Sequence, residues 1–211
     1  MKIGLIGYGS IGRRHIKNLH SLGYKNIILL RRKTSGNDYN LREFDNFDLF
    51  LDQEPSIIII SNPSSLHYYY LSKLIDLDKN IIVEKPIVTR SDDLDSLKKK
   101  LKYYKGKCFV ALNMRFHPCI KELTLMLNNN EVGKIFYSRF CVGQYLPDWR
   151  EKKDYTKVYS SKKELGGGVL LDLIHEIDLA CFLIGNQATR IKYLVSKVSH
   201  LKINCEDIAE I

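Results

Sequence analysis

Residues 1–12 of the chain read MKIGLIGYGSIG, and this stretch decides the fold of the first half of the chain. Ile3, Leu5 and Ile6 form a short apolar run that predicts a buried parallel strand. Three glycines come next in the spacing G-x-G-x-x-G, and the residues from Arg13 onward predict a helix. A glycine-rich turn without a ligand is the alternative, and the flanking strand and helix disfavour it. The spacing therefore predicts a dinucleotide-binding loop formed by Gly7, Tyr8, Gly9, Ser10, Ile11 and Gly12.

Composition narrows the class of protein. The 211 residues are 45% hydrophobic and 27% charged, which is ordinary for a globular protein of one or two domains. No run approaches the ~20 apolar residues of a membrane span, and the first residues do not read as a signal peptide. The net charge of +9 raises the possibility of nucleic acid as a partner. We expect none, because Lys and Arg are spread along the chain and a solvated helix face explains the cluster at residues 98–107.

Five cysteines are present, and they show no paired spacing. This pattern favours reduced cysteines in a cytoplasmic protein, without a disulfide framework and without a metal site.

Strands and helices alternate through the first half of the chain. We expect strands at residues 26–30, 56–60, 80–83 and 108–112, and helices at residues 11–22, 68–77 and 92–104. Ser64 or Ser65 is expected to cap the second of these helices, and residues 35–46 are expected to form a loop. The alternation predicts an α/β fold, with a doubly wound parallel sheet in a dinucleotide-binding domain of residues 1–118.

The pattern changes after residue 118. We expect helices at residues 120–127 and 169–183 and strands at residues 135–142, 191–198 and 203–211. This order predicts a second, α+β domain over residues 119–211 with a mostly antiparallel sheet. The final apolar stretch and the few strand signals predict a truncated or shortened form. Its open sheet edge is expected to favour self-association into a homo-oligomer.

The end of the second strand bears on the choice of cofactor. Arg31 and Arg32 stand about 20 positions after Gly12, where an acidic residue often binds the adenosine ribose of NAD. Arginine suits a 2′-phosphate instead, because its guanidinium can grip phosphate oxygens. The sequence thus predicts NADP, with NAD as the alternative, and exposed loop charges are the other interpretation of these arginines.

Two further groups of residues are candidates for chemistry. Lys85 follows the strand at residues 80–83, so it is expected at the sheet edge where α/β proteins bind ligands, although a surface lysine is the default interpretation elsewhere. Asp172, His175 and Asp178 are spaced to share one face of an otherwise apolar helix. Burying such groups costs free energy unless they are paired or used, so a functional role is favoured over a structural histidine.

Taken together, these segments resemble the glucose–fructose oxidoreductase and inositol dehydrogenase (Gfo/Idh/MocA) family along the whole chain. The resemblance rests on GYGSIG, on the run GGGVLLDLIHEID, and on Asn62, Pro63, His67, Glu84, Lys85, Pro86, Asn113 and Arg115. It implies that Lys85 lies beside the nicotinamide, that the Lys-Pro bond is commonly cis, and that Asp172 and His175 address a sugar hydroxyl. It also places Asn62, Pro63, His67, Glu84 and Asn113 at the cofactor and Arg115 at the substrate. Many members have four positions from the aspartate to the histidine rather than three, which leaves open which of the two residues touches the reacting oxygen.

The implied chemistry is hydride transfer between a nicotinamide cofactor and a hydroxyl or keto carbon. His175 is expected to act as general acid/base because its pKa starts near neutral, with Lys85 polarising the substrate oxygen and Asp172 orienting both. The substrate pocket is expected to contain Tyr145, Trp149 and Arg150, which suit a sugar face and an anionic group. The sequence therefore predicts an NAD(P)-dependent oxidoreductase acting on a sugar, sugar derivative or nucleotide sugar. A non-catalytic dinucleotide-binding regulator of the same fold is the alternative.

Overall fold

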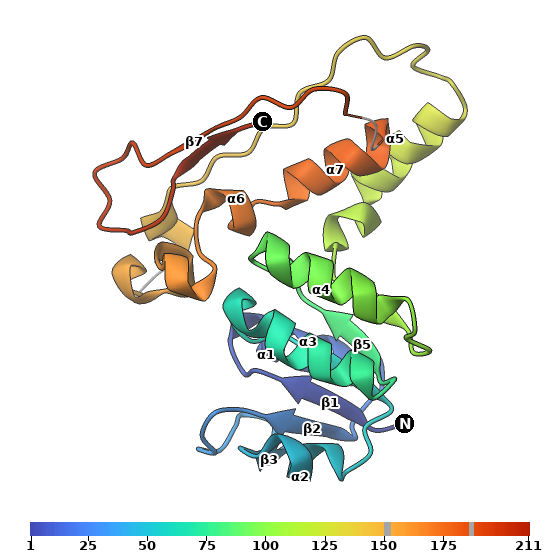
Figure 1. Cartoon of the computed structure of the whole chain (residues 1–211), viewed down its shortest axis with the longest axis vertical. Helices are drawn as coiled ribbons and strands as arrows, with labels where there is room; N and C mark the ends of the chain where they lie inside the picture. Colours follow the sequence, from blue (N-terminus) through green and yellow to red (C-terminus); the bar gives the residue numbers. More distant parts are fainter. Residues whose placement is uncertain (150–152, 186–187) are drawn as a thin grey trace. The chain divides into compact units, whose positions relative to one another are not determined.

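A computed structural model describes residues 1–149, 153–185 and 188–211 of the chain. These residues form two compact units, Met1–Ala111 (unit 1) and Leu112–Ile211 (unit 2), which run from blue to green and from green to red in Figure 1. The domain boundary expected at residue 118 stays a prediction.

Unit 1 is built on a six-stranded parallel sheet. Its strands lie in the order β3-β2-β1-β4-β5-β6. They span Ile3–Ile6 (β1), Ile27–Leu30 (β2), Arg42–Phe44 (β3), Ile57–Ile60 (β4), Asn80–Val83 (β5) and Cys108–Val110 (β6). The predicted doubly wound parallel sheet is therefore confirmed. Strand order reverses between β1 and β4, and in sheets of this kind ligands bind beyond the carboxyl ends of the strands at such a point.

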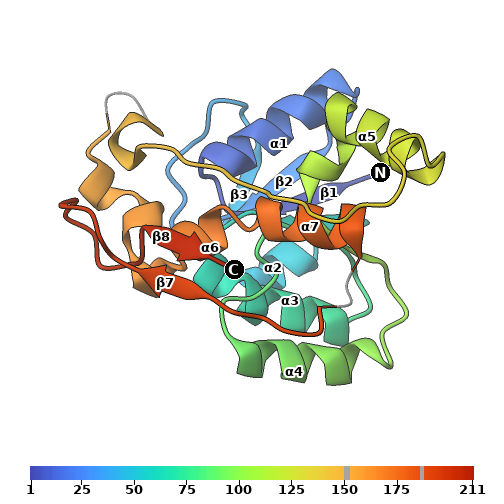
Figure 2. The same ribbon diagram turned by 90° about the horizontal axis from the view of Figure 1, so that it is seen from above.

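Helices cover both faces of this sheet. They span Ser10–Ser21 (α1), Phe47–Leu51 (α2), His67–Asp76 (α3) and Ser91–Leu101 (α4). Figure 2 shows α1 on one side of the strands and α2, α3 and α4 on the other. Alternate residues of β1 accordingly enter two apolar cores, Leu5 with Ile16 of α1 and Ile6 with Phe50 of α2. Burial of both faces explains why the strands are continuously apolar.

Two expectations for unit 1 are wrong in detail. The stretch expected to be a loop over residues 35–46 contains β3, a short edge strand whose mixed sequence carries little strand signal. Neither Ser64 nor Ser65 caps α3, since both belong to a short 3₁₀ turn, η1 (Ser64–Leu66), that precedes it.

Unit 2 combines helices with irregular structure. Its α-helices span Pro118–Asn128 (α5), Val169–Asp172 (α6) and His175–Ile184 (α7). Two short strands, β7 (Leu194–Ser196) and β8 (Ile208–Glu210), pair antiparallel. The described residues of this unit also form the 3₁₀ turns Asn113–Phe116 (η2), Leu146–Trp149 (η3), Tyr155–Lys157 (η4), Tyr159–Ser161 (η5) and Lys163–Leu165 (η6).

Unit 2 departs from the predictions more than unit 1 does. The strand expected at residues 135–142 does not form: this stretch is irregular, and the side chains of Phe136 and Tyr137 are exposed. The strands expected at 191–198 and 203–211 shorten to β7 and β8. The helix expected over 169–183 breaks at Leu173 and Ile174 into α6 and α7. A strand requires a neighbouring backbone to pair with, and sequence propensity alone does not supply one.

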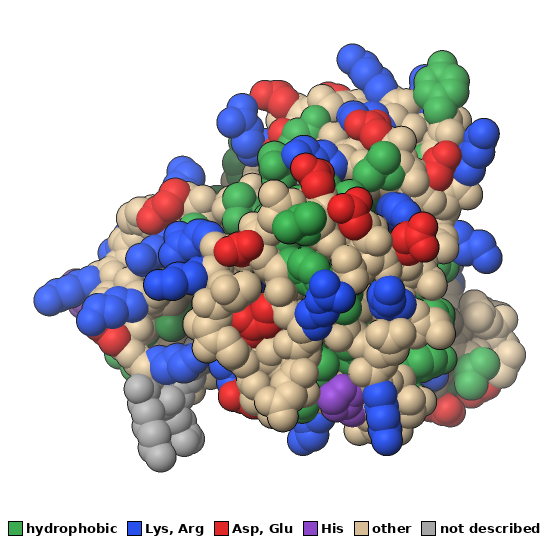
Figure 3. Space-filling view, turned by 90° about the horizontal axis from the view of Figure 1, so that it is seen from below, with side chains coloured by type: hydrophobic (Ala, Val, Ile, Leu, Met, Phe, Trp, Pro, Cys, Tyr) green, Lys and Arg blue, Asp and Glu red, His purple; other side chains and the backbone are tan. Residues whose placement is uncertain are grey.

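Surface charge is mixed on the face shown in Figure 3, where Asp and Glu side chains stand among the Lys and Arg side chains. Across the described ranges, no helix combines the length and apolarity needed to cross a membrane. The five cysteines are free thiols.

Candidate cofactor and catalytic site

The glycine loop joins β1 to α1, and its three glycines meet three different requirements. Gly7 has φ +98°, and a Cβ there would come within 2.6 Å of the Asn62 backbone nitrogen. A Cβ on Gly12 would lie 2.3 Å from the Gly7 carbonyl oxygen, so only glycine lets α1 start this close to the loop. Around Gly9 the described residues leave open space, with no atom within 4 Å of a Cβ position. That space is where a ligand could approach the backbone.

The first turn of α1 also fits an anionic ligand. Its N-cap residue is Gly9, and no described side chain caps the free backbone N–H groups there. Such amides at the positive end of a helix dipole favour a phosphate. Ser61, just after β4, stabilises the loop, because its hydroxyl donates to the carbonyl oxygens of Ile6 (3.2 Å) and Gly7 (3.1 Å).

Asn62 follows at the same edge of the sheet. Both polar atoms of its side-chain amide are buried, and neither has a hydrogen-bond partner among the described residues. Buried polar atoms are normally satisfied, so an unsatisfied amide beside the glycine loop is a feature that a bound ligand would explain. The open Gly9, the uncapped α1 amides and Asn62 together fit the pyrophosphate part of a dinucleotide.

His67, the first residue of α3, connects two strand ends. The residue is 1% exposed, with Nδ1 2.7 Å from the Pro86 carbonyl oxygen and Nε2 3.0 Å from the Asn62 carbonyl oxygen. Burial lowers the pKa of His67, whereas the two carbonyl acceptors act against that shift. His67 thus holds the loop after β4 against the loop after β5, and does so without facing open solvent.

The loop after β5 carries Glu84 and Lys85. The Glu84 carboxylate lies 2.7 Å from Nε2 of His15, a residue of α1, so the Glu84 side chain is fixed toward that helix. Lys85 is half-buried, and the Lys85–Pro86 peptide bond is cis. Glu84, Lys85 and Pro63, which the sequence predicts as cofactor contacts, thus follow neighbouring strands at the carboxyl edge of the sheet in unit 1. Their contact with a cofactor stays a prediction.

The sequence predicts that Arg31 and Arg32, at the end of β2, are both available to a phosphate, but in the structure Arg31 is already paired. Arg31 donates to Glu43 of β3 (3.2 Å) and to the Gly36 carbonyl oxygen (3.0 Å). Arg32 is exposed and forms no ion pair within the described part of the chain. Of the two predicted arginines, Arg32 alone therefore keeps its charge available.

Unit 2 holds the other candidate residues. Asp172 ends α6, is 6% exposed, and accepts a hydrogen bond from the Tyr159 hydroxyl. His175 begins α7, so the pair spans the break between two helices rather than one continuous helix face. The expectation of a shared helix face is thus corrected, although both residues remain on one short stretch.

Arg115 and Asp178 form a two-point ion pair. The Arg115 guanidinium donates through Nε (2.9 Å) and Nη2 to the two carboxylate oxygens of Asp178, and it lies 4.8 Å from the Phe182 ring centroid. This bond to Asp178 raises the pKa of Arg115. It ties η2 to α7, so a structural role accompanies the substrate contact predicted for Arg115. Asn113, at the start of η2, is exposed.

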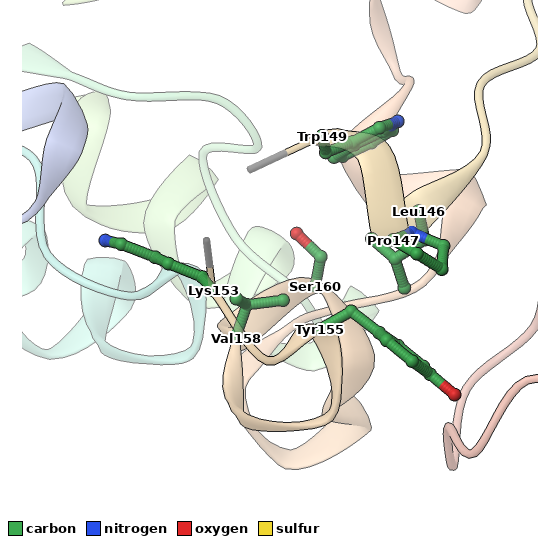
Figure 4. Close-up of a pocket in the computed structure, with 7 residues that line it drawn as sticks. All are labelled: Leu146, Pro147, Trp149, Lys153, Tyr155, Val158 and Ser160. Carbon is green, nitrogen blue, oxygen red and sulfur yellow. The ribbon is translucent and has the colours of Figure 1, made fainter. Parts of the chain in front are cut away.

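Of the three residues predicted to line a substrate pocket, the structure describes Tyr145 and Trp149. Trp149 and Ser160 border a narrow recess that has essentially no room for a water molecule, and it is also lined by Leu146, Pro147, Lys153, Tyr155 and Val158. Figure 4 shows the Ser160 hydroxyl pointing into this space, while the Lys153 amine and the Tyr155 hydroxyl point away. Tyr145 is exposed and does not line the pocket, and Arg150 lies outside the described residues.

One glycine of the triplet before α6, Gly168, is required by a contact with a distant segment of the chain. Gly168 has φ +114°, and a Cβ there would collide with the Glu206 carboxylate. The Glu206 backbone carbonyl accepts from Val169 N (3.1 Å), which fixes the start of α6. A distant segment thereby positions the helix that ends in Asp172.

Comparison with known proteins decides the family. Residues 1–112 match the family model described as "Oxidoreductase family, NAD-binding Rossmann fold", and residues 120–211 match the "GFO/IDH/MocA C-terminal domain". The chain belongs to the Gfo/Idh/MocA oxidoreductase family.

Curated relatives agree with this assignment. The chain is 25% identical over 197 residues to "Uncharacterized oxidoreductase YrbE" of Bacillus subtilis, covering 89% of this chain and 55% of that protein. It is 24% identical over 194 residues to "Glucose-6-phosphate 3-dehydrogenase" of the same organism, covering 86% of this chain and 53% of that protein. The chain therefore spans about half the length of the curated relatives it matches.

A solved structure supports the fold. The WlbA dehydrogenase from Bordetella pertussis, in complex with NADH and UDP-GlcNAcA, superposes with a TM-score of 0.77 at 19% identity. The match covers 99% of this chain and 66% of that one.

Four residues of this Gfo/Idh/MocA chain were not predicted from the sequence although each contacts a candidate: His15, Asp38, Glu43 and Tyr159. His15 follows Gly12 by one turn of the predicted helix, so its position near the loop could have been noticed. Asp38 lies in an irregular segment, Glu43 in a short edge strand and Tyr159 in a 3₁₀ turn, and no periodicity in these stretches indicates which groups meet. Among the described residues, no group of His, Cys, Asp or Glu is arranged to hold a metal ion.

Proposed function

We propose that this chain is the catalytic part of an NAD(P)-dependent oxidoreductase. It would transfer hydride between a nicotinamide cofactor and a hydroxyl or keto carbon of a sugar, sugar derivative or nucleotide sugar. The observation that carries the proposal is the glycine loop at the β1/β4 switch point, with open space over Gly9 below uncapped helix amides. Membership of an NAD-binding oxidoreductase family supports it.

The bound cofactor would supply the hydride chemistry at its nicotinamide ring. His175 would take the proton from the substrate hydroxyl during oxidation and return it during reduction. Lys85 would polarise the substrate oxygen, and Asp172 would orient His175 while the Tyr159 hydroxyl holds the Asp172 carboxylate in place. Each role is a proposal resting on the family resemblance of these three residues and on the bond from Tyr159.

The substrate class rests on relatives. One curated relative is named for a sugar phosphate, and one structural relative was solved with a nucleotide sugar. Trp149 at its pocket and Arg115 near α7 are the side chains of unit 2 that we propose for the sugar face and for an anionic group.

For the cofactor, we propose NADP(H) over NAD(H). Arg32 is exposed at the end of β2. Arg13 lies in the first turn of α1 and is paired with the exposed carboxylate of Asp38, so two cationic side chains stand on the elements that flank the adenosine ribose in this fold. Arg31 contributes less than its position suggests, because Glu43 neutralises its charge.

We also propose a homo-oligomer, since large apolar side chains such as Phe136, Tyr137 and Tyr193 are exposed in unit 2. Light scattering with the purified chain tests this: a monomeric mass would contradict it.

Calorimetric titration of the chain with NADH and NADPH tests the activity proposal. Binding of at least one nucleotide is expected, followed by turnover in a screen of sugars, sugar phosphates and nucleotide sugars. Failure of both nucleotides to bind would refute the proposal. Binding of a nucleotide without turnover of any compound in the screen would favour the regulator.

A further inference from the structure

The connection between β2 and β3 is short and lies against the glycine loop. Residues 31–41 make this parallel crossover without a helix, whereas most such crossovers use one. Asp38, near the middle of the crossover, contacts Tyr8, the residue between Gly7 and Gly9. The crossover therefore forms part of the wall where the adenosine end of a dinucleotide is expected.

Asp38 is held there by three polar contacts. Its carboxylate accepts from a guanidinium nitrogen of Arg13 and from the Tyr8 hydroxyl (3.1 Å), and its backbone N–H donates to the same hydroxyl (3.0 Å). Two guanidiniums lie over the Tyr8 ring, Arg13 at 4.5 Å and Arg31 at 5.2 Å from its centroid. An anion is thus already seated on a small cationic and aromatic site.

The charged side chains around this site differ in burial. Glu43 is fixed, because its side chain is 8% exposed and accepts from Asn37, Ser35 and Arg31. The Asp38–Arg13 pair is instead at the surface, with side chains 62% and 52% exposed. Exposed ion pairs contribute little free energy, so a stronger anion can displace the Asp38 carboxylate.

We propose that Asp38 sets the cofactor preference by occupying the position on Arg13 that the 2′-phosphate of NADP(H) would take. The inference rests on the proposed function, since it assumes that a nicotinamide dinucleotide binds at this loop. A phosphate carries more charge than a carboxylate and can bind a guanidinium through two oxygens, so it would replace Asp38. NAD(H) lacks this phosphate and leaves the Asp38–Arg13 pair in place. Asp38 would therefore weaken NADP(H) binding selectively.

The test compares Asp38→Asn with Asp52→Asn. Asp52 is also exposed, forms no ion pair among the described residues, and precedes β4 at the opposite edge of the sheet, so its loss matches the change in net charge. Calorimetry with NADPH, NADH, 2′,5′-ADP and ADP gives the affinities. We expect D38N to tighten NADPH and 2′,5′-ADP about fivefold to tenfold, as removal of one nearby like charge implies, and to leave NADH and ADP within twofold. D52N is expected to match the wild type.

Two results would overturn the inference. One is an unchanged NADPH affinity in D38N, and the other is a loss of NADH affinity, which would show Asp38 binding the ribose hydroxyls. Arg13→Gln supplies an independent check: it should weaken NADPH and abolish the gain from D38N in the double variant, and equal weakening of NADH would count against the inference. If neither nucleotide binds the wild type or D52N, the proposed function fails instead, and the two failures are thereby distinguished.

Discussion

The interactions that stabilise unit 1 differ from those that stabilise unit 2. In unit 1 the four-residue strands β1 and β2 are entirely buried, and apolar side chains from helices on both faces complete two cores. In unit 2, Leu179 and Cys205 are the buried hydrophobic residues among those described, and polar contacts such as Tyr159–Asp172 and Arg115–Asp178 connect its segments.

This difference separates the two halves of the proposed chemistry. The cofactor loop lies on a sheet whose geometry is set by apolar burial of about 25 cal/mol per Å², a term insensitive to any single polar contact. The candidate acid/base residues lie on two short helices whose ends are positioned by individual hydrogen bonds. Substitutions in unit 2 should therefore change turnover more readily than they change cofactor binding.

The largest effect that tests this separation is expected for His175→Ala. Loss of a general acid/base should lower kcat by roughly 10²- to 10⁴-fold. NADPH affinity should stay within twofold, because the glycine loop belongs to unit 1. His200→Ala removes an exposed histidine of unit 2 and should match the wild type in both measurements. An H175A variant that turns over normally would show that another residue moves the proton.

A second test concerns how well unit 2 is packed. Burial raises the pKa of the Cys205 thiol to about 11, and its Sγ contacts the Ser160 carbonyl oxygen at 3.3 Å. At pH 8 its thiolate fraction should be about a hundredfold lower than that of an ordinary cysteine. Mass spectrometry after brief iodoacetamide treatment should therefore find the exposed Cys119, Cys141 and Cys181 modified well before Cys205. Equally rapid modification of Cys205 would mean that unit 2 is not packed around this thiol.

The same contrast explains how much the sequence could predict. The strands β1, β4 and β5 were predicted to within one residue, because a strand buried on both faces needs a continuous apolar run. The residues from Val169 to Leu183 are also apolar, yet their helix breaks between Asp172 and His175. Local pattern does not record that Tyr159 binds Asp172 or that Arg115 binds Asp178, contacts made across 13 and 63 positions of the chain.

Within the candidate site, the motifs predicted which residues occupy the sheet edge but not what they contact. Arg31 stands where expected, while its neutralisation depends on Glu43 of a strand that the sequence did not indicate. Asp38 likewise comes from a crossover without periodicity. Side-chain partners of this kind follow from tertiary structure and carry no local signal.

Substitutions at two glycines of unit 1 should affect different properties, nucleotide affinity in one case and stability in the other. Gly9→Ala places a methyl group into open space at an ordinary φ of −83°. The free energy of unfolding should therefore stay the same or rise slightly. The methyl group should nevertheless lower nucleotide affinity, by about tenfold or more, because it occupies the space proposed for the pyrophosphate. Gly12→Ala should instead destabilise unit 1 by about 1–3 kcal/mol, since its Cβ would meet the Gly7 carbonyl. Urea unfolding and calorimetry measure the two effects, with Gly143→Ala of unit 2 as the neutral control. Full nucleotide affinity in G9A would exclude this loop as the pyrophosphate site.

The smallest expected effect concerns His67, the buried link between the loops after β4 and β5. Burial lowers the pKa of His67 from 6.5, so at low pH the unfolded chain binds a proton that the folded chain excludes. The free energy of unfolding should then fall as the pH drops below about 6.5, because lowering the pH favours the state that binds more protons, here the unfolded chain. In His67→Gln, whose amide still donates to one of the two carbonyls but does not titrate, this part of the pH dependence should disappear. Urea unfolding of both proteins at pH 8 and pH 5.5 measures the difference, and exposed His200→Gln should follow the wild type. If the wild type instead gains stability relative to H67Q at pH 5.5, the carbonyls of Asn62 and Pro86 hold a protonated ring between them. In that case a polar contact, rather than apolar burial, sets the protonation of His67 even in unit 1, and the contrast between the two units would no longer hold at the cofactor edge.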